Sequence, residues 1–562
     1  AVAALSTDAL TGLDEDRVKA LSSTQVGALT SAQAAGLTDG QTQYLSDVQA
    51  RVLNAGVMSR LSTTALAELS TAAVAALGTG QVNALSAAQV GFLTTAQVVA
   101  LTTVQAKALG AVQAGGLVAD QMAAMQTNDL QQLSTAAVAA LSTDALTGLD
   151  EDRVQALSST QVGSLTTDQL TSLTTVQVAA LGSQGGAGLK ASQLGALTDD
   201  KLVELNADAF AALTTSALRG LSAEQFGTLT TAQLVALTTG QAASLVTAQF
   251  SGLDTAQVNA LESRDLGSLS KAVVSSIATD ALAGIEETNI VGLTSTQVGS
   301  LTSTQIRELT AGQLAALGAD EGVGLVSTQL RALSTDSLQA LSTQAVGALT
   351  GDALRGLSTT QFGSLTTAQV VALTTVQAKA LGAVQAGGLV ADQMAAMQTN
   401  DLQQLSTAAV AALSTDALTG LDEDRVKALS STQVGALTSA QAAGLTDGQT
   451  QYLSDVQARV LNAGVMSRLS TTALAELSTA AVAALGTGQV NALSAAQVGF
   501  LTTAQVVALT TVQAKALGAV QAGGLVADQM AAMQTNDLQQ LSTAAVAALS
   551  TDALTGLDED RV

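Results

Sequence analysis

The chain has 562 residues, contains no Cys, His, Trp or Pro, and carries a formal net charge of −24 at pH 7. Nucleic acids and anionic membranes both require a positively charged protein surface, so this charge argues against both as partners. Without His and Cys the chain lacks the usual metal ligands and nucleophile–base pairs, so we expect no enzyme, no catalytic residue and no cofactor.

Apolar residues make up 47% of the chain, whereas aromatic residues make up only 1%. This apolar content is too high for a chain that stays disordered, so we expect a packed core. Ser, Thr, Gln, Asp or Gly interrupt the apolar residues every few positions. No apolar run approaches the roughly 18 residues of a membrane-spanning helix, and we expect no membrane insertion.

The first predicted element already shows the eight-residue repeat, or octad, that fills the chain. From Leu5 to Leu557 an apolar anchor recurs every eight residues, and a second apolar residue follows most anchors by five positions. The residue before the anchor is usually Ala or Gly, so the unit reads Leu-Ser/Thr-Thr-x-Gln-Val-x-Ala. We predict that both apolar positions form the core, with these representatives: Leu5, Leu13, Leu21, Leu29, Leu61, Leu69, Val18, Val26, Val74 and Val82.

An octad fits neither one continuous helix nor a simple strand. Eight residues at about 100° each leave the anchor rotated by about 80° per octad, so the apolar stripe of a long helix would wander round its surface. Leu13 and Val18 are five residues apart and would face opposite sides of a strand. Each octad must therefore contain a break in its regular structure.

The residue after the anchor indicates where this break lies. It is usually Ser, Thr, Asp, Asn or Gly, the residues that helix N-caps prefer. A Gln three positions later completes a capping box, in which its side chain accepts the N–H of the cap. In the first octads the predicted caps are Ser6, Asp14, Ser22 and Thr30, and the predicted box partners are Gln25 and Gln33.

These signals predict an all-α fold, a solenoid or superhelix of very short helices of about two turns, with one helix per octad. Leu and Val should line its inner seam, with Thr, Gln and Asp outside. One octad buries too little apolar surface to offset the entropy of ordering its backbone, so neighbouring octads must stack. The alternative is a β-solenoid with two octads per coil, which Thr and Val favour and which Ala, Leu and Gln oppose.

A longer period is superimposed on the octads. Residues 1–154 recur letter for letter as residues 409–562, and Ser6–Val18 recurs as Ser142–Val154, an offset of 17 octads. We predict one continuous solenoid over residues 1–562, with super-repeats at 1–136, 137–272, 273–408 and 409–544 and a partial one at 545–562. The sequence begins with AVAALSTDAL, without Met or a signal segment, so we expect a section of a longer chain.

Asp14, Glu15 and Asp16 form the densest acidic cluster. Carboxylate oxygens are ligands that Ca²⁺ prefers, which makes these residues the candidates for a metal site. Acidic residues in the first turn of a helix are also favoured by the helix dipole. We favour the second interpretation, an N-cap followed by acids, and predict no bound metal.

In its Leu-Thr-Thr-x-Gln-Val-x-Ala unit, the whole chain resembles the giant, low-complexity octad-repeat proteins of bacterial surfaces and secretions. The resemblance implies an exported chain, extracellular or on the cell surface, and carries over no functional residue. The unbroken register favours a structural fibre, filament or surface shaft with the chain itself as partner. The alternative is a repeat module that binds a protein or a glycan, or ice if the fold is a β-solenoid.

Overall fold

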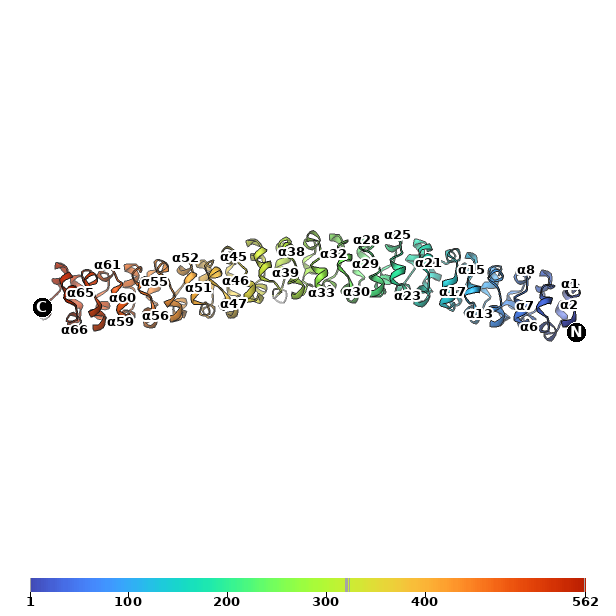
Figure 1. Cartoon of the computed structure of the whole chain (residues 1–562), viewed down its shortest axis with the longest axis horizontal. Coiled ribbons are helices and arrows are strands. Elements are labelled where there is room, and N and C mark those ends of the chain that lie inside the picture. Colours follow the sequence, from blue (N-terminus) through green and yellow to red (C-terminus); the bar gives the residue numbers. More distant parts are fainter. Residues whose placement is uncertain (1, 319–321, 323, 560, 562) are drawn as a thin grey trace. The chain divides into compact units, whose positions relative to one another are not determined.

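The computed structural model, shown in Figure 1, describes residues 2–318, 322, 324–559 and 561. These described residues form 67 α-helices and two 3₁₀ helices, and none of them lies in a strand. The predicted all-α fold with one very short helix per octad is confirmed, and the β-solenoid alternative is wrong. Ala1 and Val562, the ends of the predicted continuous solenoid, lie outside the described residues.

The α-helices follow the octad register. The first three are α1 (Thr7–Thr11), α2 (Glu15–Ala20) and α3 (Ser23–Gly27). Helix starts are eight residues apart throughout three series: α1–α39 from Thr7 to Ala311, α41–α54 from Ser327 to Ser431, and α55–α68 from Asp447 to Thr551. The 3₁₀ helices are η1 (Val2–Ala4) and η2 (Gln441–Gly444), and η2 occupies the octad between α54 and α55.

Each α-helix is four, five or six residues long. The first residue of a helix, from the series above, and its length give its last residue. Six residues form α2, α6, α9, α13, α15, α17, α21, α23, α30, α33, α38, α39, α41, α42, α43, α47, α49, α51, α53, α56, α59, α63, α65 and α67. Five residues form α1, α3, α8, α10, α11, α12, α18, α19, α22, α26, α28, α29, α32, α35, α45, α46, α52, α54, α58, α60, α61 and α62. Four residues form α4, α5, α7, α14, α16, α20, α24, α25, α27, α31, α34, α36, α37, α44, α48, α50, α55, α57, α64, α66 and α68. None of these described helices is long and apolar enough to cross a membrane.

At least two residues, the anchor and the N-cap that follows it, separate one helix from the next. Helix α6 (Asp47–Val52) ends at the anchor Leu53, which has φ −57° and ψ 130°, and the following N-cap, Asn54, has φ −78° and ψ 158°. At most six of the eight residues therefore remain helical. The predicted length of about two turns is too long, because the anchor itself leaves the helix.

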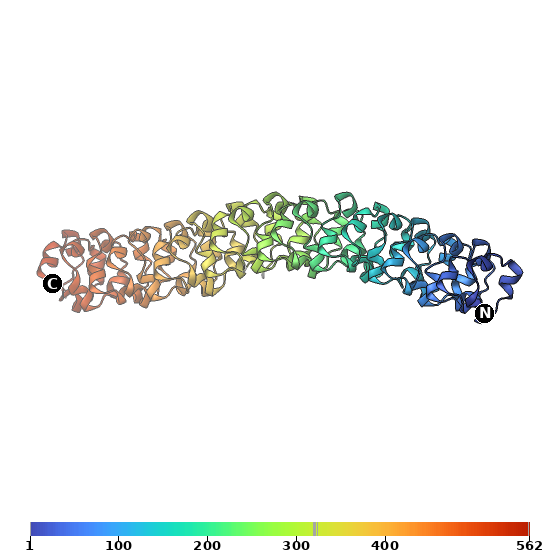
Figure 2. The same cartoon turned by 45° about the vertical axis from the view of Figure 1, so that its right-hand side comes forward.

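Successive helices wind into coils that stack on one another. Helices three apart in the sequence pack together, for example α6 on α9 (Thr71–Ala76) and α56 (Asp455–Val460) on α59 (Thr479–Ala484). Hydrogen bonds from Gln side chains reach backbone carbonyls 28 residues earlier, as from Gln97 to Leu69. One coil therefore takes about 28 residues, or 3.5 octads. Figure 2 shows these stacked coils.

The chain divides into two compact units, Ala1–Gly284 and Ile285–Val562. Each unit is a stack of coils with its own core, and the last helix of the first unit is α35 (Thr279–Ala283). The limit between the first two predicted super-repeats, at residues 136 and 137, falls inside α17 (Thr135–Ala140). The octad register thus continues through that limit.

The core of each unit forms where the two apolar positions of the octad meet inside the coils. Most predicted representatives are at most 4% exposed: Val18, Val26, Val74, Val82, Leu29, Leu61 and Leu69. Leu5 is 37% exposed, and Leu13 and Leu21 are only half-buried. These three anchors lie in the first coil, so no preceding coil covers them as it covers the later anchors.

The expectation that Gln lies on the outside is wrong. Most octad glutamines are buried, including Gln33 at 4% and Gln97 at 1% exposure. The N-cap Ser and Thr residues, by contrast, are mostly exposed. A buried amide must find hydrogen-bond partners, and these glutamines find them in the preceding coil.

Candidate functional site

In most octads that contain it, the octad glutamine joins its coil to the coil before it. In α12 (Thr95–Val99) the Thr94 N–H donates to Gln97 Oε1 at 2.9 Å, and the Gln97 N–H donates to the Thr94 hydroxyl at 3.2 Å. Gln97 Nε2 then donates to the carbonyls of Leu66 at 3.0 Å and Leu69 at 2.7 Å. Gln97 Nε2 also contacts the Ala67 carbonyl at 3.0 Å. One buried side chain therefore completes the cap of its own helix and bonds to three carbonyls of the preceding coil.

We call the repeated arrangement the amide ladder: glutamines whose Nε2 donates to carbonyls 28 and 31 residues earlier, as Gln97 does. An amide suits this place because it offers one acceptor and two donors, and the carbonyls at helix C-termini need donors. In the first unit its members are Gln33, Gln41, Gln49, Gln81, Gln89, Gln97, Gln105, Gln121, Gln161, Gln169, Gln177, Gln193, Gln233, Gln241 and Gln249. In the second unit they include Gln329, Gln361, Gln369, Gln377, Gln393, Gln433, Gln441, Gln449, Gln457, Gln489, Gln497, Gln505, Gln513 and Gln529.

Other side chains make the bond between coils in some octads without this Gln. The N-cap Asn54 accepts the Val57 N–H at 3.0 Å and donates from Nδ2 to the Leu29 carbonyl at 2.7 Å. Arg153 stands at the position of the octad Gln, and its Nε donates to the Met125 carbonyl at 2.8 Å, again 28 residues earlier. The anchor carbonyl thus receives a donor from different chemical groups.

We expect Asn54→Ser to lower the free energy of unfolding of its coil by about 1 kcal/mol and Asn54→Ala by about 2 kcal/mol. Serine keeps the cap acceptor and reaches the preceding coil less closely, since the N-cap Ser342 makes the equivalent bond to the Leu317 carbonyl at 3.2 Å against 2.7 Å for Asn54, whereas alanine loses both bonds. Hydrogen exchange of the amides in α7 (Ala55–Met58) measures the difference. Equal effects of the two substitutions would contradict a separate bond between coils.

The predicted caps occupy the N-cap positions of their helices. The Ala9 N–H donates to the Ser6 hydroxyl at 3.2 Å. Ser22 and Gln25 exchange cap bonds at 2.8 and 3.3 Å, and Thr30 and Gln33 do so at 2.8 and 3.3 Å. Gln33 also donates to the carbonyls of Val2 and Leu5, each at 2.8 Å, whereas Gln25 lies in the first coil and stays exposed.

The acidic cluster at the start of α2 is occupied by local interactions. Asp14 is the N-cap, and its Oδ1 accepts the Arg17 N–H at 3.0 Å while its other oxygen pairs with the Arg17 guanidinium. Glu15 pairs with Lys19, and this hydrogen bond raises the pKa of the Lys19 ammonium. Asp16 is exposed in the first turn. Among the described residues, no three His, Cys, Asp or Glu side chains gather where they could hold a metal ion.

Sequence reasoning missed four buried carboxyl groups. They occupy the octad position of the ladder Gln, are at most 3% exposed, and are Asp129, Asp265, Asp401 and Asp537. Burial raises the pKa of each of these carboxyl groups. The sequence signal was an Asp at the Gln position once every 17 octads.

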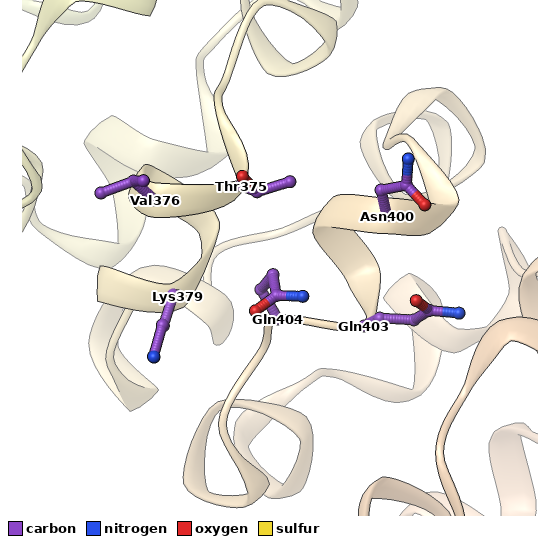
Figure 3. A pocket seen from close by; sticks show the side chains of 6 residues that line it. All are labelled: Thr375, Val376, Lys379, Asn400, Gln403 and Gln404. Atoms are coloured by element: carbon purple, nitrogen blue, oxygen red, sulfur yellow. The ribbon is translucent and has the colours of Figure 1, made fainter.

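A shallow surface depression adjoins one of these buried acids. It lies between α47 (Thr375–Ala380) and α50 (Thr399–Leu402), the helix that contains Asp401, and Figure 3 shows Gln404 between the two helices. Its lining is exposed and mostly polar: Thr375, Val376, Lys379, Asn400, Gln403 and Gln404. An equivalent depression, 17 octads later, is lined by Thr511, Val512, Lys515, Asn536, Gln539 and Gln540.

The residues that build the amide ladder also define a known sequence repeat. Seven segments match the ALTTAQ repeat. They are residues 76–103, 122–159, 207–239, 346–375, 394–430, 483–511 and 530–562. In Ala100–Gln105, ALTTVQ, the letters of the ALTTAQ repeat correspond to the residue before the anchor, the anchor, the N-cap and the first helical residues up to the ladder Gln. The chain is thus a tandem-repeat protein with ALTTAQ repeats. No curated protein matches it.

Proposed function

We propose that this chain is the shaft of an extended extracellular fibre, filament or surface appendage, built by a bacterium. The observation that carries the proposal is the amide ladder, in which buried glutamines spaced along both units bond to the preceding coil. Such bonding makes a continuous structural element, because each coil depends mainly on its neighbours. The resemblance to bacterial surface and secreted octad-repeat proteins supports the location outside the cell.

The octad register supports the same proposal. Anchors recur every eight residues from Leu5 to Leu557 without an insertion or a deletion. Protein scaffolds that bind ligands commonly carry loops of variable length on one face, and this chain has none in its register. The net charge of −24 keeps a large assembly soluble.

We propose that the partner is a second copy of the chain. Apolar side chains more than half exposed recur over both units, and they are Val48, Phe92, Val104, Val112, Val176, Val376, Val384, Val456, Phe500, Val512 and Val520. Exposed apolar surface of this kind favours contacts between copies. Because these side chains recur along the chain, contacts between copies would repeat as well and would favour open filaments or bundles.

Images of the full chain in negative stain should show particles far longer than wide. With 562 residues and about 28 per coil, continuous stacking makes about 20 coils, and a helix-packing distance of 8–10 Å per coil makes a particle about 160–200 Å long. Small-angle X-ray scattering measures the same maximum dimension in solution. Short globular particles would refute the shaft.

The second proposal is a module that binds a protein or a glycan. The depression in Figure 3 supports it, because the depression recurs 17 octads later and offers amide groups and one ammonium group to a polar ligand. Binding to a glycan array that is lost when Lys379 and Lys515 are replaced by Glu would favour this module over the shaft. The ice-binding alternative is withdrawn, because it required the Thr hydroxyls to lie on a β-solenoid.

A further inference from the structure

Four octads carry an aspartate at the position where a ladder octad has glutamine. They follow one another at intervals of 17 octads. They contain Asp129 in α16 (Thr127–Leu130), Asp265 in α33 (Ser263–Ser268), Asp401 in α50 and Asp537 in α66 (Thr535–Leu538). Glu321, the other acidic residue at this octad position, lies outside the described residues. The sequence around Asp265 has diverged, from QTNDLQQL to ESRDLGSL, yet the Asp-Leu pair remains.

An ionised carboxyl group at this position cannot make the hydrogen bonds that a ladder Gln makes to the preceding coil. A ladder Gln donates to carbonyls 28 and 31 residues earlier, which for Asp129 are those of Leu101 and Val98. A carboxylate has only acceptor oxygens, so it has no hydrogen to offer to a carbonyl. Protonation supplies one O–H donor at the same place.

In three of these octads, the N-cap Gln makes a hydrogen bond to the preceding coil but none to the carboxyl group. The N-cap Gln126 donates from Nε2 to the Val99 carbonyl at 3.0 Å, and Gln398 and Gln534 make the equivalent bonds to Val371 and Val507. The coil therefore keeps one bond to its predecessor in these octads. Within the described part of the chain, no hydrogen bond is made by the carboxyl groups of Asp129, Asp401 and Asp537.

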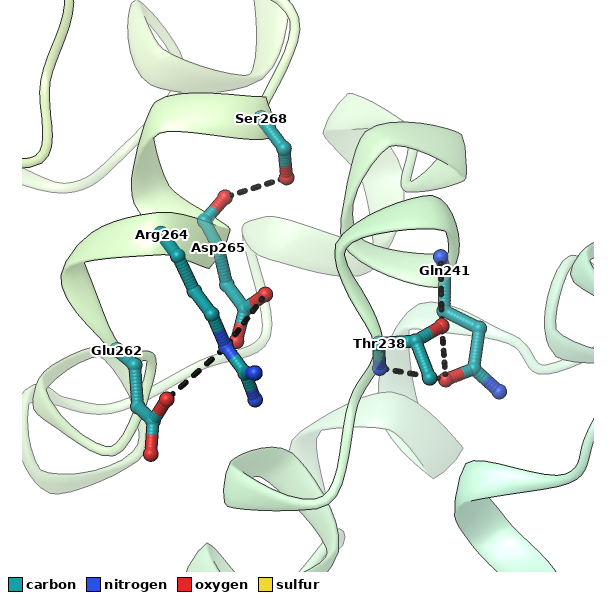
Figure 4. A network of polar contacts seen from close by, with 6 residues as sticks. All are labelled: Thr238, Gln241, Glu262, Arg264, Asp265 and Ser268. Atoms are coloured by element: carbon teal, nitrogen blue, oxygen red, sulfur yellow. Dashed lines mark hydrogen bonds and ion pairs between the residues drawn. The ribbon is translucent and has the colours of Figure 1, made fainter.

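Asp265 is the most enclosed of the four. It is 0% exposed, and among the described residues neither carboxyl oxygen has a hydrogen-bond partner. Arg264 Nε lies 3.8 Å from Asp265 Oδ1 but only 3.0 Å from Glu262 Oε2, on the exposed side of the helix. Figure 4 shows the Asp265 carboxyl group pointing away from Ser268, whose hydroxyl bonds to the Asp265 backbone carbonyl.

The helices packed against the helices of these acids carry few charged residues. For Asp129 they are Lys107 on α13 (Thr103–Ala108) and Glu151, Asp152 and Arg153 on α19 (Glu151–Gln155). For Asp401 they are Lys379 on α47 and, on α53 (Glu423–Ala428), Glu423, Asp424, Arg425 and Lys427. For Asp537 the charged residue is Lys515 on α63 (Thr511–Ala516). Helix α30 (Thr239–Ser244), packed against α33, contributes none, and the charges that act on Asp265 are those of Arg264 and Glu262 in its own octad.

We propose that these four aspartates regulate the contact between successive coils by gaining or losing a proton. We call each of the four contacts, in α16, α33, α50 and α66, a joint of the solenoid. When protonated, each carboxyl group donates its O–H to a backbone carbonyl of the preceding coil and completes the ladder. When ionised, it leaves a buried negative charge that receives no hydrogen bond, and the contact between the two coils loosens. The fixed interval of 17 octads places one such joint in each super-repeat.

Acidification therefore tightens these joints. Burial raises the pKa of all four carboxyl groups in the folded chain. A group whose pKa is raised on folding contributes its stability below its unfolded pKa and loses it as pH rises through the folded pKa. A pKa that is higher by one in the folded chain corresponds to about a tenfold change in the local folding equilibrium.

The test compares the parent chain with a variant that carries Asp129→Asn, Asp265→Asn, Asp401→Asn and Asp537→Asn. Asparagine has nearly the same shape, is neutral at every pH and provides an N–H donor. At about pH 7 we expect amide exchange in α16, α33, α50 and α66 to be at least about tenfold slower in the variant, corrected for intrinsic exchange rates. At about pH 4 the two proteins should exchange alike.

The chain offers a matched control at the same spacing. Asp144, Asp280, Asp416 and Asp552 are exposed and also recur every 17 octads. Their replacement by Asn removes the same charge from the chain, and it should leave exchange in the four joints unchanged at both pH values. The same slowing in this control would assign the effect to net charge and overturn the proposal.

Two further measurements on the folded proteins decide whether a proton operates the joints. Infrared spectra recorded through a pH titration should show carboxyl groups that stay protonated to higher pH in the parent than in the four-Asn variant, because burial raises the pKa of these four groups above the usual range. Absence of this signal would overturn the proposal. Faster exchange in the variant at pH 7 would also overturn it, as would stabilisation of the parent alone by Na⁺, K⁺ or Ca²⁺, which would assign the carboxylates to a cation instead.

Discussion

Replacing Gln97 by Glu should lower the free energy of unfolding of its coil by about 3 kcal/mol at pH 7. The substitution keeps the size of the side chain and its acceptor for the Thr94 N–H. It removes both donors to Leu66 and Leu69 and places a negative charge against their carbonyl oxygens. An unpaired buried charge costs more than a missing neutral hydrogen bond.

Gln25 provides the matched control for this prediction. It makes the same cap bonds with Ser22 but is exposed, because it lies in the first coil. Gln25→Glu should therefore change stability by less than about 0.5 kcal/mol. Hydrogen exchange resolved by coil is the suitable measurement, since repeat proteins unfold in parts. Equal effects at Gln25 and Gln97 would show that the bonds between coils contribute little.

The effect of Gln97→Glu should also depend on pH. Burial raises the pKa of the introduced carboxyl group in the folded chain relative to the unfolded chain. The stability deficit should then shrink as pH falls, because the protonated carboxyl group regains one O–H donor to the preceding coil.

Replacing Gly116 by Ala should destabilise the contact between two coils by about 3 kcal/mol. Gly116 precedes the anchor Leu117 and follows α14 (Ala111–Ala114). A Cβ atom at this position would lie closer than 3.0 Å to the backbone of Ala87 at the start of α11 (Ala87–Gly91). Backbone cannot rotate away as a flexible side chain can, so the two coils must separate.

Gly80 is the control for the close approach. It lies within α10 (Thr79–Asn83), and a Cβ atom there would have no other atom within 4 Å. Gly80→Ala should stabilise the chain by about 0.5–1 kcal/mol, because alanine is the better helix former. Thermal unfolding and coil-resolved hydrogen exchange measure both variants. A tolerated Gly116→Ala would mean that the coils are packed less closely than the structure has them.

The elements of the fold could be predicted because their causes lie within one octad. Ser22 and Gln25 form a capping box across three residues, and this local bonding starts a helix whatever the rest of the chain does. The regular recurrence of Leu and Val likewise identified most of the core. The estimated helix length failed because the sequence did not show that the anchor, such as Leu53, adopts an extended conformation.

The side that Gln97 faces could not be predicted, because its partners stand 28 and 31 residues away. An amide next to a cap is typical of a solvated surface until a neighbouring coil brings carbonyls to it. The burial of the four aspartates could not be predicted either, because it also depends on a coil about 28 residues away. In the sequence they resemble ordinary acidic residues in the first turn of a helix.

The sequence by itself determined that this protein is α-helical, repeats in octads and buries Leu and Val. Only the tertiary structure decided how many octads form a coil, which polar side chains lie inside, and where glycine is required, as at Gly116. The physical reason is range: capping and apolar periodicity act over a few residues, whereas burial and hydrogen bonding between coils depend on how the backbone winds over about 28 residues.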